Sequence, residues 1–287
     1  AVLEVNAGPG FRMHLAPTTG LPRNVAAPVV DKLFPTKGDT GRIPIIAITG
    51  TNGKTTTTRL IAHMAKMKGF RVGYTTSDGV YIQNSMLMKG DCTGPSSAEF
   101  VLKDPTVNFA VLECARGGLL RAGLGFKRCD VGIVTNVSGD HLGLRGIHTI
   151  EQLAKVKGVI PETVLPDGYA ILNADDDLVF GMRRSIECNL ALFSMDENNP
   201  RIKALQKLGG ITAIYENGYV TLCRGVWKMR VMKVEDIPLT FGGKATFMIQ
   251  NVLPAIIAAN VQGITIEDMR MALSSFIPSA DQTPGRM

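Results

Sequence analysis

A short apolar segment that runs directly into a loop of glycine, hydroxyl and lysine residues limits the possible folds of this chain more than any other feature. Residues 45–49 have the β-branched composition of a buried strand, and Gly-Thr-Asn-Gly-Lys-Thr-Thr follows at 50–56. A helical pattern begins near Lys54. Glycines let backbone N–H groups point toward one place, and a helix N-terminus adds positive potential there. The order of strand, loop and helix therefore predicts a binding site for the phosphates of a nucleotide.

The loop also predicts how those phosphates are held. Lys54 can reach the β and γ phosphates, and Thr55 can bind a magnesium ion. The usual P-loop has a glycine six residues before the lysine, where this chain has Ile48, so the loop is a variant of the form GTNGKTT. A plain glycine turn with a solvated lysine is the weaker alternative, because all three elements occur in the required order. The other residues of the predicted cradle are Gly50, Thr51, Asn52, Gly53 and Thr56.

The composition excludes several classes of protein. The chain has 287 residues, of which 45% are apolar and 20% are charged, enough for the core of one large domain or two small ones. No stretch has the apolar length of a membrane span. The five cysteines are scattered and form no CxxC pair, which argues against a disulfide framework and a zinc site. We therefore expect a cytoplasmic, enzyme-like chain with no membrane partner.

The charge of the chain suits an anionic ligand without choosing among ligands. The formal net charge is +6 and the pI is about 9.1, which would suit a nucleotide, an acidic polymer or a nucleic acid. Aromatic residues make up only 6% and no basic run contains interleaved aromatics, so a nucleic-acid surface has little support. The chain lacks an initiator methionine and stops directly after a helical pattern. We expect a fragment of a longer protein.

Strand and helix patterns alternate from residue 43 onward, which predicts an α/β fold with a mainly parallel sheet covered by helices. Strands are expected at 45–49, 70–75, 108–113, 131–136 and 169–173, and helices at 54–68, 96–103 and 149–159. Further strands at 211–215, 218–223 and 226–233, with an Asn-Gly turn between the first two, predict a small antiparallel sheet beside the main one. Helices at about 250–262 and 266–275 follow. A strand at 1–5 and a helix at 24–34 precede this region.

Polar residues follow several of the predicted strands, at the sheet edge where ligands of an open α/β sheet collect. Glu113 is a hard oxygen ligand that could meet a magnesium ion near Thr55. His141 could serve a second metal ion or orient a phosphate. The alternatives are a solvated strand-end acid for Glu113 and a packing or capping role for His141.

These motifs together resemble the central domain of the Mur ligase superfamily, which covers ATP-dependent muropeptide ligases and folylpolyglutamate synthases. The resemblance spans about 43–287, in the order GTNGKTT, strand-end glutamate, NVSGDH at 136–141, a helical lysine, LNADD at 172–176 and a helix that opens with Gln250 and Asn251. The stretches GDCTGPSSAEF at 90–100 and ECARGGLLRAGLGF at 113–126 most resemble the cyanophycin synthetases within that superfamily. In those enzymes an ATP-grasp domain precedes the Mur-like domain.

The resemblance implies a role for each matched residue. Residues 50–56 would hold the triphosphate, Thr55 and Glu113 would hold one magnesium ion, and His141 would help to hold a second. In many family members a carbamylated lysine bridges to that second metal ion, and Lys157 and Lys155 are the candidates here. The spacing along the helix favours Lys157. Further residues expected near the nucleotide are Asn136, Asp175, Asn251 and Arg286, with Asn251 and Asp175 near adenine and ribose.

The resemblance also divides the chain. Residues 1–34 would be the tail of an ATP-grasp domain, 35–42 a linker, 43–282 the Mur-type central domain, and 283–287 the start of a third domain. Glu4 and Asn6 match the metal-binding end of an ATP-grasp site, because oxygen ligands two positions apart share one face of a strand. A strand with one exposed polar face is equally plausible.

The implied chemistry is an ATP-dependent ligation. ATP, with magnesium, would phosphorylate the β-carboxylate of an aspartate on a poly-aspartate chain, and the α-amine of arginine would displace the phosphate to form an amide. Arg116 and Arg121 are candidates for contacting the acidic chain or a phosphate, with simple surface charge as the alternative. The full-length enzyme would be a homo-oligomer. The other readings are a different Mur-type ligase, acting on a muropeptide or folate, and a nucleotide-binding module without ligase activity.

Overall fold

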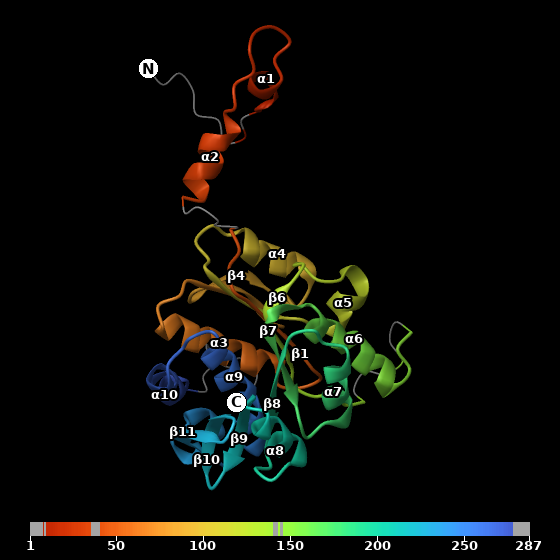
Figure 1. Ribbon diagram of the computed structural model, residues 1–287, viewed down its shortest axis with the longest axis vertical. Helices are drawn as coiled ribbons and strands as arrows, with labels where there is room; N and C mark the ends of the chain where they lie inside the picture. The colour runs from red at the N-terminus through yellow and green to blue at the C-terminus, as the bar shows by residue number, and fades with distance from the viewer. Residues whose placement is uncertain (1–7, 9, 36–40, 140–142, 144–145, 278–287) are drawn as a thin grey trace. The chain divides into compact units, whose positions relative to one another are not determined.

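The computed structural model describes residues 8, 10–35, 41–139, 143 and 146–277 of the chain. It divides the chain into two compact units, Ala1–Arg42 and Ile43–Met287 (Figure 1). In the first unit, α1 (Arg12–Leu15) and α2 (Ala26–Leu33) contain no buried residue. The helix expected at 24–34 is thus present with shorter bounds, whereas the strand expected at 1–5 lies outside the described residues.

A single eleven-stranded sheet forms the centre of the second unit, in the order β11-β10-β9-β8-β7-β6-β1-β5-β2-β3-β4. The strands are β1 (Ile45–Thr49), β2 (Val72–Thr75), β3 (Gly79–Ile82), β4 (Ser85–Lys89), β5 (Phe109–Glu113), β6 (Cys129–Val134), β7 (Val164–Asn173), β8 (Asn189–Ser194), β9 (Ile211–Glu216), β10 (Tyr219–Arg224) and β11 (Trp227–Lys233). The seven central strands from β2 to β9 in this order are parallel to their neighbours. The predicted α/β class with a mainly parallel sheet is confirmed.

The antiparallel strands lie at the two edges of this sheet. At one edge β10 and β11 continue antiparallel from β9, and at the other β3 and β4 continue antiparallel from β2. The expectation of a separate small antiparallel sheet is therefore wrong in one respect, because β9 pairs in parallel with β8 and joins its hairpin to the main sheet. The sequence analysis identified neither β8 nor the β3–β4 hairpin.

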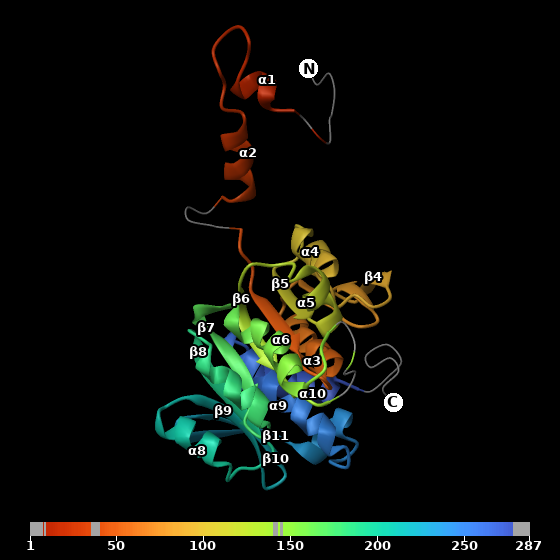
Figure 2. The ribbon, with the colours of Figure 1, turned by 90° about the vertical axis from the view of Figure 1, so that its right-hand side faces the viewer.

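Helices cover both faces of the sheet (Figures 1 and 2). One face packs against α3 (Lys54–Met67), α9 (Thr246–Val261) and α10 (Ile266–Ser275), and their apolar residues join Ile46 and Ile48 of β1 in one core. The other face packs against α4 (Pro95–Lys103), α5 (Arg116–Ala122), α6 (Ile150–Glu162), α7 (Asp177–Gly181) and α8 (Pro200–Lys207). Three short 3-10 helices span Met182–Arg184, Val234–Asp236 and Pro238–Thr240. Among the described residues, no helix is long and apolar enough to cross a membrane.

The topology places the glycine loop at the point where the direction of winding reverses. Strand β1 lies between β5 and β6, and β2 lies beyond β5. The chain therefore moves outward from β1 to β2, returns to β5, and crosses β1 to continue with β6. Ligands of open α/β sheets bind at such switch points, beyond the carboxyl ends of the strands. The loop after β1 stands at that position.

Candidate nucleotide site

Two glycines of the loop have backbone angles and close neighbours that disfavour any side chain. Gly50 and Gly53 have φ values of +148° and +84°, a region that L side chains rarely adopt. A Cβ at Gly50 would lie 1.9 Å from the hydroxyl of Thr135, and one at Gly53 would lie 2.1 Å from the amide oxygen of Asn251. The loop between them leads directly into α3, which begins at Lys54. Its backbone is thus fixed by conformation and by close neighbours.

The end of β6 holds this loop in place. The Asn52 N–H donates to Asn136 Oδ1 at 2.9 Å, and Asn136 Nδ2 donates to the Asn52 carbonyl at 3.2 Å. The Thr51 N–H donates to the Asn136 carbonyl at 2.9 Å, and the Thr135 hydroxyl donates to the Asn52 carbonyl at 2.6 Å. In this structure, then, Asn136 shapes the loop that was predicted to cradle the phosphates.

Three basic side chains, those of Lys54, Arg116 and Lys157, influence one another beside the loop. Lys54 Nζ donates to the carbonyls of Gly50 and Thr51 at 3.1 and 2.9 Å. Lys157, on α6, is only 3% exposed, and burial lowers its pKa to about 7, with the charges of Lys54 and Arg116 acting in the same direction. The two lysines of that helix differ, because Lys155 is exposed to solvent. This local positive charge is suited to a polyanionic ligand.

Three oxygen-bearing side chains meet at the start of α3. The Thr55 hydroxyl donates to Glu113 Oε2 at 2.8 Å and lies 3.2 Å from the Ser77 hydroxyl oxygen. The Ser77 N–H also points to Glu113 Oε2, at 3.3 Å. The structure thus brings the predicted pair Thr55 and Glu113 together. It adds Ser77, which the sequence analysis missed although Ser77 follows a short strand in a polar run.

This oxygen group fits a magnesium ion. Magnesium takes hard oxygen ligands and is usually bound through one or two carboxylates, waters and substrate phosphates. Glu113 is 3% exposed and Thr55 is 3% exposed, so their oxygens face each other in a protected place, while Ser77 is exposed. Among the described residues, no group of three or more His, Cys, Asp or Glu could hold a metal ion. A site here would therefore rely on hydroxyls and a nucleotide as well as on Glu113.

Two cavities open along this edge of the sheet. The first has a volume of about 300 Å³ and is lined by Thr51, Asn52, Gly53, Lys54, Thr55, Ser77, Asp91, Thr93, Glu113 and Ala115. The second, of about 260 Å³, shares Asp91, Thr93 and Ala115 with the first and extends to the start of α4 and to Arg121. The shared residues make the two cavities neighbours. Arg121, predicted to contact an acidic chain, lines the second one.

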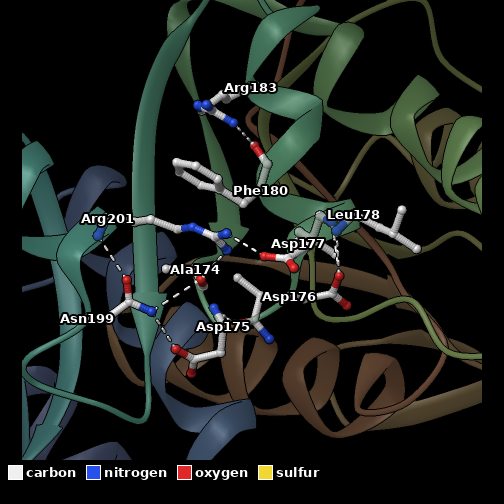
Figure 3. A network of polar contacts seen from close by, with 11 residues as sticks. Ala174, Asp175, Asp176, Asp177, Leu178, Phe180, Arg183, Asn199 and Arg201 are labelled. Carbon is white, nitrogen blue, oxygen red and sulfur yellow. Dashed lines mark hydrogen bonds and ion pairs between the residues drawn. The ribbon is translucent and has the colours of Figure 1, made fainter.

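Beyond β7, the predicted ribose residue Asp175 makes a different kind of contact (Figure 3). Its carboxylate accepts hydrogen bonds from the Ser194 hydroxyl at 2.5 Å, the Met195 N–H at 2.8 Å and Asn199 Nδ2 at 2.9 Å. Arg201 donates to the Ala174 carbonyl and forms an ion pair with Asp177. These contacts tie the end of β7 to the end of β8 and to α8.

On the opposite side of the loop, Asn251 packs against Gly53 and is 7% exposed. One helical turn earlier on α9, Phe247 is 62% exposed. Side chains four residues apart share one helix face, so the exposed ring of Phe247 lies on the same face of α9 as Asn251. The sequence analysis did not identify it. The remaining predicted site residues, His141, Glu4, Asn6 and Arg286, lie outside the described residues.

Comparisons with known proteins identify the family of this chain and relatives of its fold. The Mur ligase middle domain family matches residues 48–259. The cyanophycin synthetases of Geminocystis herdmanii (strain PCC 6308) and of Synechocystis sp. (strain ATCC 27184 / PCC 6803 / Kazusa) are 58% and 57% identical over 286 residues, which cover 100% of this chain and 33% of each relative. A solved structure of UDP-N-acetylmuramoyl-L-alanyl-D-glutamate--2,6-diaminopimelate ligase has a TM-score of 0.64 at 23% identity, covering 85% of this chain and 48% of that chain. This chain spans about a third of the length of these curated relatives.

Proposed function

Because this chain belongs to the Mur ligase family, through a middle domain at residues 48–259, we propose that it is the ATP-binding part of an amide-forming ligase. The observation that carries the proposal is the meeting of Thr55, Ser77 and Glu113 at the start of α3, beside Lys54 and the first cavity. A carboxylate paired with hydroxyls at a P-loop suits magnesium and nucleotide phosphates. Bound magnesium would neutralise phosphate charge and draw two anions together.

The chain's own residues would position the triphosphate. The N–H groups at the start of α3 would bind phosphate oxygens, while those of Thr51 and Asn52 stay bonded to Asn136. Lys54 would exchange its bonds to the loop carbonyls for bonds to the phosphates, where its charge stabilises the transferring phosphoryl group. Phe247 would stack on the base, with Asn251 beside it. This arrangement leaves Asn136 as a residue that holds the loop.

The second cavity would receive the carboxylate that is phosphorylated. It adjoins the first cavity at Ala115, and it presents the start of α4 and the charge of Arg121. A carboxylate oxygen there would attack the γ-phosphorus, ADP would leave, and an acyl phosphate would form. An amine would then attack the acyl carbon, releasing phosphate and one proton and leaving an amide. Both steps bring reactants together more than they require acid or base from the protein.

We further propose that the substrates are those named by the resemblance, an aspartate chain and arginine. The high identity to cyanophycin synthetases supports this choice over a muropeptide or folate. Lys157 is our candidate for the carbamylated lysine, because its amine is buried near the phosphate loop and an uncharged amine is the form that reacts with carbon dioxide. The homo-oligomeric state and the ATP-grasp origin of residues 1–34 stay predictions. A cytoplasmic location suits the five free cysteines.

The proposal is tested by ADP release from the full-length protein on a poly-aspartate primer, with and without arginine. We expect arginine-dependent release that Lys54→Ala abolishes and that the matched variant Lys155→Ala, changed at an exposed position, retains. Release that needs a muropeptide or folate instead would identify another Mur-type ligase. Nucleotide binding without any substrate-dependent release would identify a binding module.

A further inference from the structure

A buried ionic cluster lies next to the oxygen group of the proposed site. Arg59 is four residues after Thr55 on α3 and is 5% exposed. Its Nη2 forms an ion pair with Asp78 and donates a hydrogen bond to the Tyr81 hydroxyl at 2.8 Å. The Tyr81 hydroxyl in turn donates to Asp78 Oδ2 at 2.5 Å. The three groups thus form a closed triangle of polar contacts.

Two stacked rings fix the orientation of the guanidinium. Tyr74 and Tyr81 lie with their centroids 4.7 Å apart and their planes 4° apart. The guanidinium carbon of Arg59 is 4.8 Å from the centroid of Tyr81 and 5.9 Å from that of Tyr74. A planar guanidinium beside aromatic rings and a carboxylate has one preferred orientation, which a lysine ammonium cannot reproduce.

Asp78 transmits this orientation to the turn between β2 and β3. Its Oδ1 accepts a hydrogen bond from the Thr76 hydroxyl at 2.9 Å, and Ser77 stands between these two residues. The Asp78 carbonyl accepts from the Gly90 N–H at 2.9 Å, and the Thr76 carbonyl accepts from the Cys92 N–H at 3.1 Å. The Asp78 carboxylate thus holds the turn that carries Ser77, and the backbone carbonyls of the same turn hold the segment that carries the cavity-lining residues Asp91 and Thr93.

We propose that Arg59 is a positioning residue, which acts through Asp78 to hold Ser77 against Thr55 and Glu113 in the geometry that a nucleotide-bound magnesium ion requires. This inference rests on the proposed function of the site. It adds a role for three residues, Arg59, Asp78 and Tyr81, that line neither cavity. Apolar side chains of similar volume could fill the same space at lower desolvation cost, but they would not set the direction of a serine hydroxyl.

Nucleotide affinity measured with and without magnesium separates positioning from general stability. The chain would be titrated with the non-hydrolysable analogue AMP-PNP, once with magnesium chloride and once with EDTA, and its thermal unfolding would be recorded in parallel. We expect Asp78→Asn and Arg59→Lys to reduce the affinity gained from magnesium about tenfold, while the affinity in EDTA changes less than about twofold. Tyr81→Phe, which keeps the ring and loses one hydrogen bond, should reduce the gain about threefold.

The matched control is Arg270→Lys, at an arginine on α10 that donates to the backbone carbonyls of Arg230 and Val231 at the far edge of the sheet. It should leave the magnesium gain unchanged even if it lowers the unfolding temperature. The positioning role would be overturned if the Arg59 and Asp78 variants bound AMP-PNP equally more weakly in magnesium chloride and in EDTA. It would also be overturned if they lowered the unfolding temperature but kept the affinity gained from magnesium. If Arg59→Lys does not fold, Asp78→Asn and Tyr81→Phe decide by the same criterion. A wild-type chain that gains no affinity from magnesium contradicts the proposed function itself.

Discussion

Two acidic residues at the same edge of the sheet, Glu113 at the end of β5 and Asp175 after β7, have opposite surroundings. Glu113 is buried, faces the hydroxyls of Thr55 and Ser77, and lines the first cavity. Asp175 is more exposed, yet its two oxygens accept bonds from Ser194, Met195 and Asn199. Glu113, which lines the first cavity, is placed to exchange a protein contact for a ligand contact there.

The contrast shows that a strand-end acid marks the ligand edge of an α/β sheet without defining its own role. At the β7 end, the Asp175 carboxylate accepts the hydrogen bonds that Ser194 and Met195 donate from the end of β8. At the β5 end, the carboxylate accepts from the Thr55 hydroxyl and the Ser77 N–H, and a metal ion could rearrange these contacts. Neighbours contributed by other elements decide which acid is available for chemistry.

The largest expected difference between the two acids is in catalysis. Glu113→Gln keeps the side-chain volume and removes the charge, so we expect kcat for ADP release by the full-length protein to fall on the order of 10²-fold or more. Glu99→Gln is the matched control, because Glu99 on α4 is exposed and forms an ion pair with Lys103 one turn later. Unchanged turnover in Glu113→Gln would remove Glu113 from the site.

The second expected effect is on stability and concerns Asp175. Asp175→Ala removes the acceptor of three hydrogen bonds, and for a partly exposed carboxylate we expect the free energy of unfolding to fall by about 2 kcal/mol. Urea denaturation would measure it. The affinity for the magnesium-bound nucleotide analogue should change less than about threefold. A large loss of affinity at unchanged stability would instead support the ribose contact that the sequence predicted.

The fold could be predicted largely from local patterns, and the errors have physical causes. The parallel core follows from apolar, β-branched runs that alternate with helical patterns, so β1, β5, β6 and β7 were expected near their observed positions. Strand β4 is exposed along its whole length and lacks the apolar alternation that indicates a strand. Without β8, the hairpin that begins with β9 had no visible link to the core, so it was expected as a separate sheet.

The site was predictable where one segment carries it and not where distant segments meet. The loop at 50–56 and Glu113 carry recognisable local signals. The role of Ser77 depends on Arg59 and Asp78, whose contacts with the turn arise only when α3 packs beside β2 and β3. Likewise, Asp175 and Glu113 look alike in sequence, since each stands at the end of a predicted strand. What distinguishes Asp175 is its contacts with Ser194 and Asn199, which come from other elements.

The third prediction concerns the protonation of Lys157, the buried lysine of α6. Between about pH 7 and 10.5 the unfolded chain binds more protons at Lys157 than the folded chain, whose Lys157 pKa is lowered to about 7 by burial. The free energy of unfolding should therefore rise with pH in this window, by up to about 1.4 kcal/mol per pH unit from this group. Urea denaturation at several pH values in carbon dioxide-free buffer would measure it. Lys157→Met should lose this contribution, and Lys155→Met should retain it.

The smallest expected effect decides between two aromatic rings as the partner of the base, Phe247 on α9 and Phe180 on α7. Phe247 is exposed and lies one helical turn before Asn251. Phe180, after β7, lies against two guanidiniums, because the guanidinium carbons of Arg183 and Arg201 are 3.7 and 4.4 Å from the centroid of its ring. Stacking of a base on an aromatic ring contributes about 1 kcal/mol, so Phe247→Ala should weaken ATP binding about fivefold.

The same variant should leave the binding of inorganic tripolyphosphate unchanged, because that ligand has phosphates and no base. Phe180→Ala serves as the matched variant and should alter neither affinity, since its ring is already occupied by two protein cations. Calorimetric titration of both variants with both ligands gives four values. If Phe180→Ala weakens ATP binding and Phe247→Ala does not, the base lies at the β7 end, and Asp175 becomes a nucleotide ligand as well as a structural acceptor.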